Sequence, residues 1–386
     1  MRGSRAGNLA PLTGLRACAA LLVFAGHLEH LGLTDQQEGE LRACKIFTQR
    51  TTAVGLFFAL SGFVLAYRHG AERGAAAASS FLRGRLKRLL PLYLIAVTAY
   101  VPVGIAHHDR PAYLSAQYLG LQAWIPNPHA WFTWHGGAWS VSTEFFFYLC
   151  FPLVLPLLRR LRSQLDVVVV WGQVWLTLLV VWVVRIYLQH GSGLDFWVYP
   201  FPPVRLLEFL LGALTATLFQ QRSARPLPLG AGPLGSALLV ILLCTVPGAE
   251  YKPLAYPLLF VPCFSLLLYF LASSRGLSAR ALSSPALQWA GETSYAFYLL
   301  AGSGLAVGGW TVDQIGLGPS FLARSLVGVP VALVVGGVVA DLATRAVACV
   351  LEPGGGEATA AAAQKSAHVG AKQHRIPQRR PDGVEA

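Results

Sequence analysis

The first long apolar stretch of the chain reads Gly14-Leu15-Arg16-Ala17-Cys18-Ala19-Ala20-Leu21-Leu22-Val23-Phe24-Ala25-Gly26-His27. Arg16 and His27 stand eleven positions apart in it. Eleven residues at about 100° each make roughly three helical turns, so the stretch predicts that both side chains share one helix face, about 16 Å apart along its axis. Because ionisable groups are costly in hydrocarbon, two of them inside a membrane span indicate a functional site.

The composition indicates an integral membrane protein. Hydrophobic residues make up 54% of the 386 residues and charged residues only 12%. Apolar stretches of about twenty residues, the length that crosses a bilayer, recur along the chain. We therefore predict an all-α, polytopic membrane helix bundle with ten transmembrane helices, near 12–33, 52–67, 89–106, 139–158, 167–188, 203–219, 231–247, 254–272, 288–310 and 321–345.

The distribution of Lys and Arg predicts the orientation of the bundle. Basic residues gather in 68–88, in 159–162 and in the C-terminal tail, while the alternate loops hold few. Under the positive-inside rule, this pattern predicts a multi-pass plasma-membrane protein with both termini cytoplasmic. It also accounts for the net charge of +12. Because the charge is spread over many short loops, we do not expect nucleic-acid binding.

The domain organisation is predicted to be simple. Residues 1–352 form one membrane domain, and residues 353–386 form a basic tail whose triglycine, polyalanine and polar composition predicts disorder. The six cysteines show no paired spacing, so neither a disulfide framework nor a metal site is indicated. No internal repeat supports an inverted-repeat transporter. The first span is longer than a secretory signal core and is read as retained.

Arg85 and Arg88 precede the third predicted span and are three positions apart, so they are neighbours on a helix surface. Two guanidinium groups in that arrangement can hold a phosphate group. The alternative is topological, because basic residues also belong at a cytoplasmic membrane boundary and bind anionic lipid head groups.

The fourth predicted span opens with Trp139-Ser140-Val141-Ser142-Thr143-Glu144. A carboxylate at the head of an apolar run has to be paired, protonated or hydrated, which makes Glu144 a candidate site residue. It can equally be a helix-start carboxylate that the helix dipole favours, with Ser140 or Ser142 as the cap.

Three other features are expected to be mainly structural. Ser61 and Gly62 within the second span, and Gly304 and Gly308 in the ninth, are typical of close helix packing. Arg205 and Glu208 are placed to pair locally.

The aromatic and histidine-rich connection over 107–138 either anchors the chain at the membrane interface or contributes to substrate binding.

His27 has a possible chemical role that follows from its side chain. A neutral imidazole near pH 7 can take the proton of an alcohol that attacks a carbonyl, which is general-base catalysis. The alternatives are that His27 only hydrogen-bonds a neighbour and that Arg16 only extends its charge to the cytoplasmic surface.

Taken together and in order, these segments resemble the membrane acyltransferases usually called acyltransferase family 3. The resemblance covers about residues 9–348. It rests on the Arg16 and His27 pair, the Phe57 to Phe63 run, Arg85 with Arg88, Trp139 to Glu144, and a late segment with Ser294, Tyr295, Tyr298 and Leu299. The resemblance departs at Ala301, where the family commonly has a histidine, and at Gly55, where it often has an acidic residue.

The resemblance implies an integral membrane O-acyltransferase that moves an acyl group, often acetyl, from acyl-CoA to a hydroxyl of a carbohydrate or a glycosylated natural product. It makes acyl-CoA the co-substrate, with no permanently bound cofactor and no metal. The expected catalytic residues are His27 as base, with Arg16 and Glu144. Arg85 and Arg88 are expected to bind the coenzyme, and the residues expected to support the site are Trp139, Ser140, Ser142, Ser61, Ser294 and Tyr295.

Two other classes of function remain open. A transporter or flippase of a glycan or lipid-linked substrate would move its substrate without forming an ester, and its ionisable residues would extend into the later spans. A structural or sensory membrane protein would tolerate replacement of Arg16 and His27. The acceptor, the acyl length and the oligomeric state do not follow from the sequence.

Overall fold

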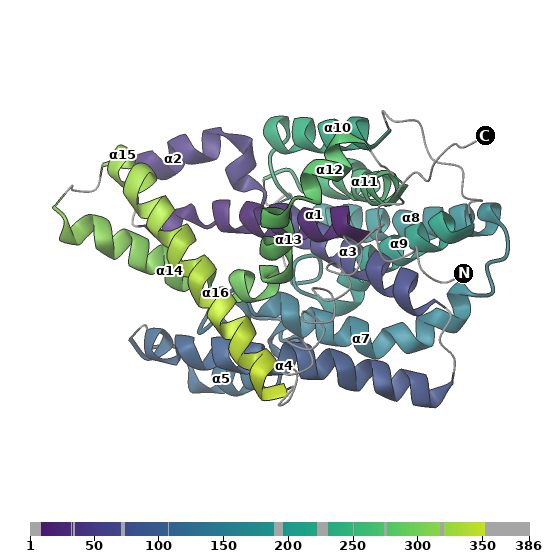
Figure 1. Ribbon diagram of the computed structural model, residues 1–386, viewed down its shortest axis with the longest axis horizontal. Coiled ribbons are helices and arrows are strands. Elements are labelled where there is room, and N and C mark those ends of the chain that lie inside the picture. The colour runs from purple at the N-terminus through teal and green to yellow at the C-terminus, as the bar shows by residue number, and fades with distance from the viewer. Residues whose placement is uncertain are drawn as a thin grey trace, which may run out of the picture.

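The computed structural model describes residues 9–31, 33, 35–70, 74–106, 108–188, 196–221, 231–249, 251–273, 276–316 and 320–351. This part of the chain is helical and contains no strand. It therefore confirms an all-helical fold (Figure 1). The tail predicted over 353–386, and with it the domain boundary at residue 352, lies outside the described residues.

Seven helices of the described chain are long and apolar enough to cross a membrane. They are α3 (Arg50–His69), α4 (Ala75–Ala106), α7 (Trp139–Leu158), α8 (Gln164–Leu188), α9 (Pro202–Gln221), the π turn Tyr256–Phe260 with α11 (Val261–Ser273), and the π turn Arg324–Gly328 with α16 (Val329–Leu351).

The other three predicted spans are also helical but do not join these seven. They correspond to α1 (Ala10–Ala25), α10 (Ala231–Thr245) and α14 (Ser294–Gln314). Because α1 and α10 are shorter apolar helices, the predicted count of ten spans is not confirmed.

Short helices join the long ones. Between α1 and α3 lie the 3-10 turn Leu28–Leu31, α2 (Asp35–Ala43) and the turn Lys45–Thr48. The connection before α7 holds α5 (Pro111–Tyr118), the turn Gln122–Trp124 and α6 (Pro128–Phe132). The remaining short helices, in the last third of the chain, are α12 (Leu277–Leu282), α13 (Pro285–Glu292) and α15 (Phe321–Ala323).

Three predicted boundaries are wrong. The ninth span was expected over 288–310, but α13 ends at Glu292 and α14 begins at Ser294. The region 68–88 was expected to be a loop, but α4 begins at Ala75, because its alanine-rich start strongly favours helix. The first span was expected to reach residue 33, but α1 ends at Ala25. There the His27 N–H bonds the Phe24 oxygen at 3.0 Å, so the backbone tightens into 3-10 geometry and His27 lies in a turn beyond the helix.

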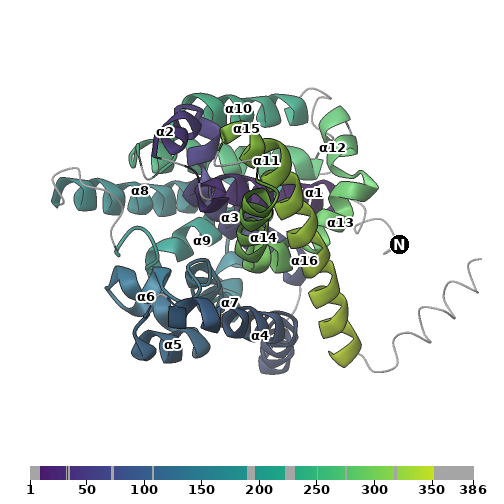
Figure 2. The same cartoon turned by 90° about the vertical axis from the view of Figure 1, so that its left-hand side faces the viewer.

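Helix α1 lies inside the bundle. It contacts α3, α11, α12, α13 and α14, and viewed end-on α1 and α3 are surrounded by the other helices (Figure 2). The helix therefore places Arg16 and the turn that carries His27 among other helices of the bundle.

Glycines allow the closest helix contacts. A Cβ atom on Gly62 of α3 would lie 1.9 Å from the Phe209 oxygen, and one on Gly212 of α9 would lie 1.8 Å from the Ala59 oxygen. In α14, the Gly304 and Gly308 positions similarly approach the backbone of the segment that forms α16, which confirms their predicted packing role.

Candidate active site

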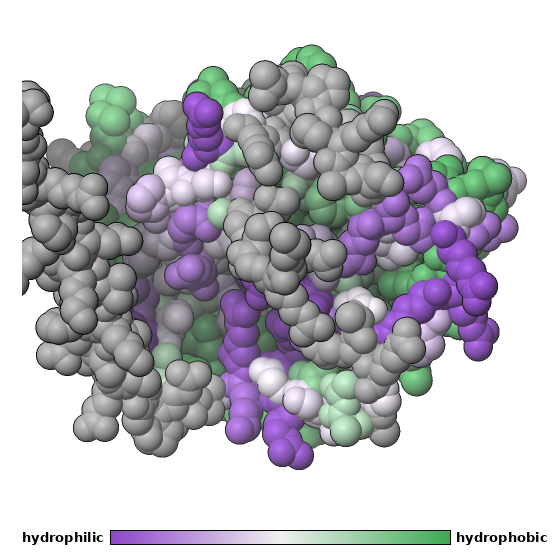
Figure 3. Space-filling view, turned by 45° about the vertical axis from the view of Figure 1, so that its right-hand side comes forward, coloured by the Kyte–Doolittle hydropathy of each residue, from purple (hydrophilic) through white to green (hydrophobic). Residues whose placement is uncertain are grey.

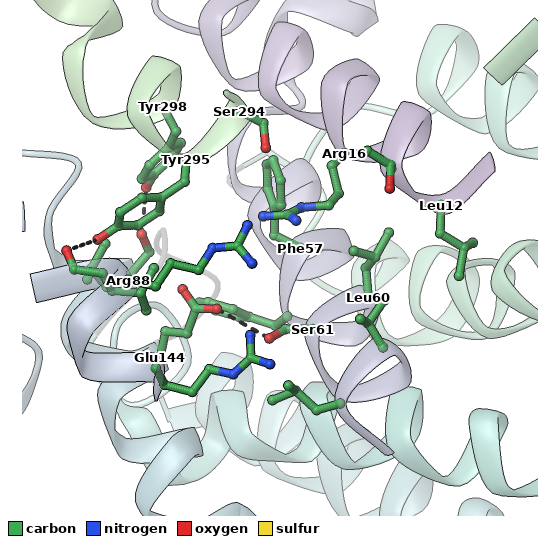
Figure 4. Close-up of a pocket in the computed structure, with 18 of the residues that line it drawn as sticks. Leu12, Arg16, Phe57, Leu60, Ser61, Arg88, Glu144, Ser294, Tyr295 and Tyr298 are labelled. Atoms are coloured by element: carbon green, nitrogen blue, oxygen red, sulfur yellow. Dashed lines mark hydrogen bonds between the residues drawn. The ribbon is translucent and has the colours of Figure 1, made fainter. Parts of the chain in front are cut away.

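The first cavity of about 320 Å³ lies between α1, α3, α4, α7 and α14. Four guanidinium groups and two carboxylates line it: Arg16, Arg68, Arg85, Arg88, Glu144 and Glu292. The arginines come from three helices, and in Figure 4 Arg16 and Arg88 reach into the same space from opposite walls. The cavity therefore concentrates positive charge and is suited to an anionic ligand.

Three of the four arginines, Arg68, Arg85 and Arg88, come from the end of α3 and the first half of α4. An Arg85 Nη2–H donates to His69 Nε2 at 3.2 Å, and the Arg85 guanidinium lies 5.5 Å from the centre of the Phe81 ring. Arg68 and Arg88 are exposed. Figure 3 brings this end of the molecule forward, with hydrophilic side chains gathered on it. The first cavity is thus open to the basic end of the bundle.

Glu144 faces the first cavity from α7. Its Oε1 accepts hydrogen bonds from the Ser61 hydroxyl at 3.2 Å and from the Tyr148 hydroxyl. Arg16 and Arg85 both lie close enough to Glu144 to interact with it electrostatically. Glu144 therefore balances part of the arginine charge, and it lines a different cavity from His27.

A second cavity, of about 410 Å³, surrounds the turn after α1. Its polar side chains include His27, His30, Arg50, Thr51 and His135. Its aromatic walls are Phe24, Tyr100, Phe132, Trp139 and Tyr199. A cavity of mixed polar and aromatic lining is typical of sites for small organic ligands.

One hydrogen bond determines which nitrogen of His27 can act as a base. His27 Nδ1 lies 2.7 Å from the Val23 oxygen. A carbonyl oxygen only accepts, so Nδ1 carries the proton and, in the neutral ring, Nε2 is the basic nitrogen. The ring follows the C-terminus of α1, where the helix dipole favours positive charge. His27 is therefore arranged to take up a proton at Nε2.

Two residues, Val54 of α3 and Tyr298 of α14, line both cavities. The Tyr298 hydroxyl donates to the Gly137 oxygen at 2.9 Å and lies 2.7 Å from the Ser140 Oγ. The ring also makes an edge contact with Phe57, at 6.3 Å between centroids. The partition between the cavities is thus fixed from three helices.

The other predicted support residues have separate positions. Ser294 and Tyr295 line the first cavity, and Trp139 lines the second. Ser142 lines neither: its hydroxyl donates to the Gly120 oxygen at 2.5 Å and anchors α7 to the preceding connection.

Arg205 and Glu208 form the predicted local pair, and the pair supports Trp139. The two side chains are fully buried and 2.6 Å apart. Arg205 also donates to the Tyr199 oxygen at 2.6 Å, and its guanidinium lies 5.8 Å from the Trp139 ring centre. This network fixes the start of α7.

At both positions where the chain departs from the family pattern, Gly55 and Ala301, the structure shows which polar side chains lie nearby. A Cβ atom on Gly55 would lie 1.7 Å from the Tyr256 hydroxyl and 3.1 Å from a Glu208 oxygen, so Glu208 supplies a carboxylate beside this position. Ala301 lines the second cavity together with His135, which is buried and lies 2.9 Å through Nε2 from the Leu299 oxygen.

Sequence reasoning did not select Arg68, Arg50 or Val54. A signal for Arg68 existed, because Ser61 and Arg68 are seven positions apart and therefore share a helix face. Arg50 had no such local signal, since its place beside His27 depends on how α3 packs against α1. His135 was included only through the composition of the 107–138 connection.

The matching family model and one similar protein are both described as acyltransferases. Residues 10–341 match the family model described as an acyltransferase domain. Acyltransferase MdmB of Streptomyces mycarofaciens is 30% identical over 312 residues, which is 76% of this chain and 78% of that protein. Protein 2 in picA locus of Rhizobium radiobacter is 39% identical over 88 residues, 22% of this chain and 40% of that protein. No solved structure matches significantly.

Proposed function

Because this chain belongs to the acyltransferase domain family that its residues 10–341 match, we propose that it transfers an acyl group from acyl-CoA to a hydroxyl of a carbohydrate or glycosylated natural product. The membrane helices and the family make it a multi-pass membrane acyltransferase. The observation that carries the proposal is the pair of cavities that meet at Val54 and Tyr298, one lined by arginines and the other by His27.

The first cavity is the proposed donor site. Coenzyme A carries several phosphates, and guanidinium groups bind phosphate oxygens through paired N–H donors. Arg85 and Arg88 hold the phosphates in this account, while Arg16, deeper on α1, orients the arm that bears the thioester. Arg68, which also lines the cavity, adds to the positive potential. Under the positive-inside rule, the basic residues around this cavity support a cytoplasmic location for it, on the side where the donor is made.

His27 is the proposed general base. Its Nε2 accepts the proton of the acceptor hydroxyl while the hydroxyl oxygen attacks the thioester carbonyl. The new C–O bond forms, the C–S bond breaks, and the coenzyme sulfur leaves as a thiolate that recovers the proton from the imidazolium. The α1 C-terminus stabilises that imidazolium. A positioned base of this kind contributes about 10²–10⁴-fold, and binding and orientation supply the rest.

The second cavity is the proposed acceptor site. Its aromatic walls suit the apolar faces of a sugar ring, while His30, Arg50 and Thr51 offer polar groups for its hydroxyls. The transporter alternative gains no support, because the family model and the Streptomyces relative are both described as acyltransferases.

The proposal is tested with membranes that contain the full chain, acetyl-CoA labelled in the acetyl group, and a panel of methyl glycosides. Wild type and His129→Ala, an exposed histidine outside both cavities, are expected to form labelled ester. His27→Ala at equal expression is expected to be about 10²–10⁴-fold slower. Equal ester formation by His27→Ala would rule out the general base, and no ester from any glycoside would contradict the acceptor class.

A further inference from the structure

The two cavities adjoin at the two residues that line both of them, Val54 and Tyr298, and the proposed reaction requires a reactant to pass between these side chains. Val54 is 6% exposed, and Tyr298 is held by Ser140, Gly137 and the edge of Phe57. We call Val54 and Tyr298 together the neck. The inference below rests on the proposed donor site and concerns what passes this neck.

The arginines and the base lie on opposite sides of the neck. Arg16, Arg85 and Arg88 line the first cavity, and His27 lines the second. If the coenzyme phosphates stay with the arginines while the reacting carbonyl meets His27, one reactant has to extend through the neck. The donor is the thinner of the two, because the part of its arm next to the thioester is unbranched, whereas the acceptor presents a whole ring.

The acyl group is the leading end of that arm. It lies beyond the sulfur, so it has to enter the neck before the carbonyl can reach His27. A branch next to the carbonyl widens this leading end, whereas an unbranched chain of the same number of carbons keeps a constant cross-section. A rigid neck therefore discriminates by acyl width more strongly than by acyl length.

We propose that Val54 and Tyr298 select the acyl donor by its cross-section, admitting acetyl and short unbranched acyl groups and excluding branched ones. Val54 supplies the steric limit through its two methyl groups. Tyr298 is a positioning residue whose hydroxyl bonds keep the opposite wall from moving.

The first test compares acetyl-CoA with isobutyryl-CoA as donors to whichever methyl glycoside the wild type acylates best. Val54→Ala is expected to raise the kcat/KM ratio of isobutyryl to acetyl transfer by about tenfold, the effect of one or two methyl groups in an apolar pocket. Val97→Ala is the matched control, because Val97 is a buried valine of α4 that lines neither cavity. An equal ratio in the two variants would overturn the proposal.

Tyr298→Phe provides a second variant that keeps the ring and removes the hydroxyl bonds to Gly137 and Ser140. It is expected to raise the same ratio by a smaller factor than Val54→Ala, because the freed ring still fills part of the neck. An unchanged ratio in Tyr298→Phe would remove the positioning role of the hydroxyl.

A further measurement does not depend on the acceptor. A branched acyl-CoA with a diazirine on its acyl group is photolysed with each protein, and the labelled peptides are identified. In Val54→Ala, labelling is expected to extend to second-cavity peptides such as residues 20–27 and 132–137; in wild type and Val97→Ala it is expected to stay in the first cavity. Identical labelling in all three proteins would overturn the proposal that the neck selects the acyl donor. The expected labelling without any ester product would overturn only the proposed acceptor.

Discussion

Arg16 and His27, eleven positions apart in the chain, line two different cavities. Arg16 faces a space with three other arginines, while His27 stands in the turn after α1 among aromatic side chains. The short apolar helix between them therefore connects the proposed donor site to the proposed acceptor site. This arrangement separates binding of the coenzyme from proton transfer, and each function can be changed on its own.

Arg88→Ala is expected to weaken donor binding while leaving the chemical step largely intact. A hydrogen bond to a charged group contributes about 1.5–3 kcal/mol, so the KM for acetyl-CoA should rise roughly tenfold to a hundredfold. Steady-state kinetics with a saturating acceptor concentration measures this KM.

Lys87→Ala is the control for that variant. Lys87 is an exposed neighbour that carries the same charge but lines neither cavity. It should leave KM near the wild-type value. Equal increases in KM for both variants would show a general effect of surface charge instead of a phosphate contact.

Gly212→Ala is expected to destabilise the bundle. The added methyl group would lie 1.8 Å from the Ala59 oxygen, so α3 and α9 would have to separate, and such overpacking typically costs about 1–3 kcal/mol. Thermal unfolding in detergent measures the loss. Gly172→Ala in α8 is the matched control, because the added Cβ would meet no atom within 4 Å beyond its own stretch of helix backbone, and since alanine favours helix it should unfold at or above the wild-type temperature. Equal unfolding temperatures for the two variants would refute the close α3–α9 contact.

His135 is expected to make folding stability depend on pH. Burial lowers the pKa of this imidazole, which lies in the connection before α7, from 6.5 to about 4. Between these values the unfolded chain binds the proton and the folded protein does not, so stability present above pH 6.5 falls as the pH drops towards 4. The loss amounts to about 3 kcal/mol in total.

The measurement for His135 is the unfolding temperature at pH 7.5 and at pH 5, for wild type and for His135→Gln. The wild type should lose more stability than the variant, because the glutamine does not titrate. The same decrease in both proteins would show that other groups cause the pH dependence. An unfolding readout is needed because protonation of His27 would also lower the activity.

Local features of the fold followed from the sequence. The helix over 139–158 has the predicted bounds, and Arg205 pairs with Glu208 as expected, because both depend on neighbouring residues in one apolar segment. Apolar length also located the other helices. It did not separate helices long enough to cross a membrane from the shorter α1 and α10, since hydropathy does not show where a buried turn interrupts the helix.

The arrangement of the site was harder to predict. Arg16, Arg88 and Glu144 converge only through the packing of α1, α4 and α7, and single-helix periodicity carries no information about that packing. The expectation that His27 and Arg16 share a continuous helix was wrong because α1 ends at Ala25. The neck could not be predicted as a unit: Val54 has no local signal, and Tyr298, although part of the late motif, lies on a helix distant from Val54 in the sequence.

The most direct test of the two-cavity account measures donor binding and ester formation on the same preparation of His27→Ala. We predict that labelled acetyl-CoA binds this variant as tightly as it binds wild type, because the arginine cavity is unchanged. Ester formation should fall about 10²–10⁴-fold, because the base is gone. Ester formed at the wild-type rate, or a parallel loss of donor binding, would contradict the account.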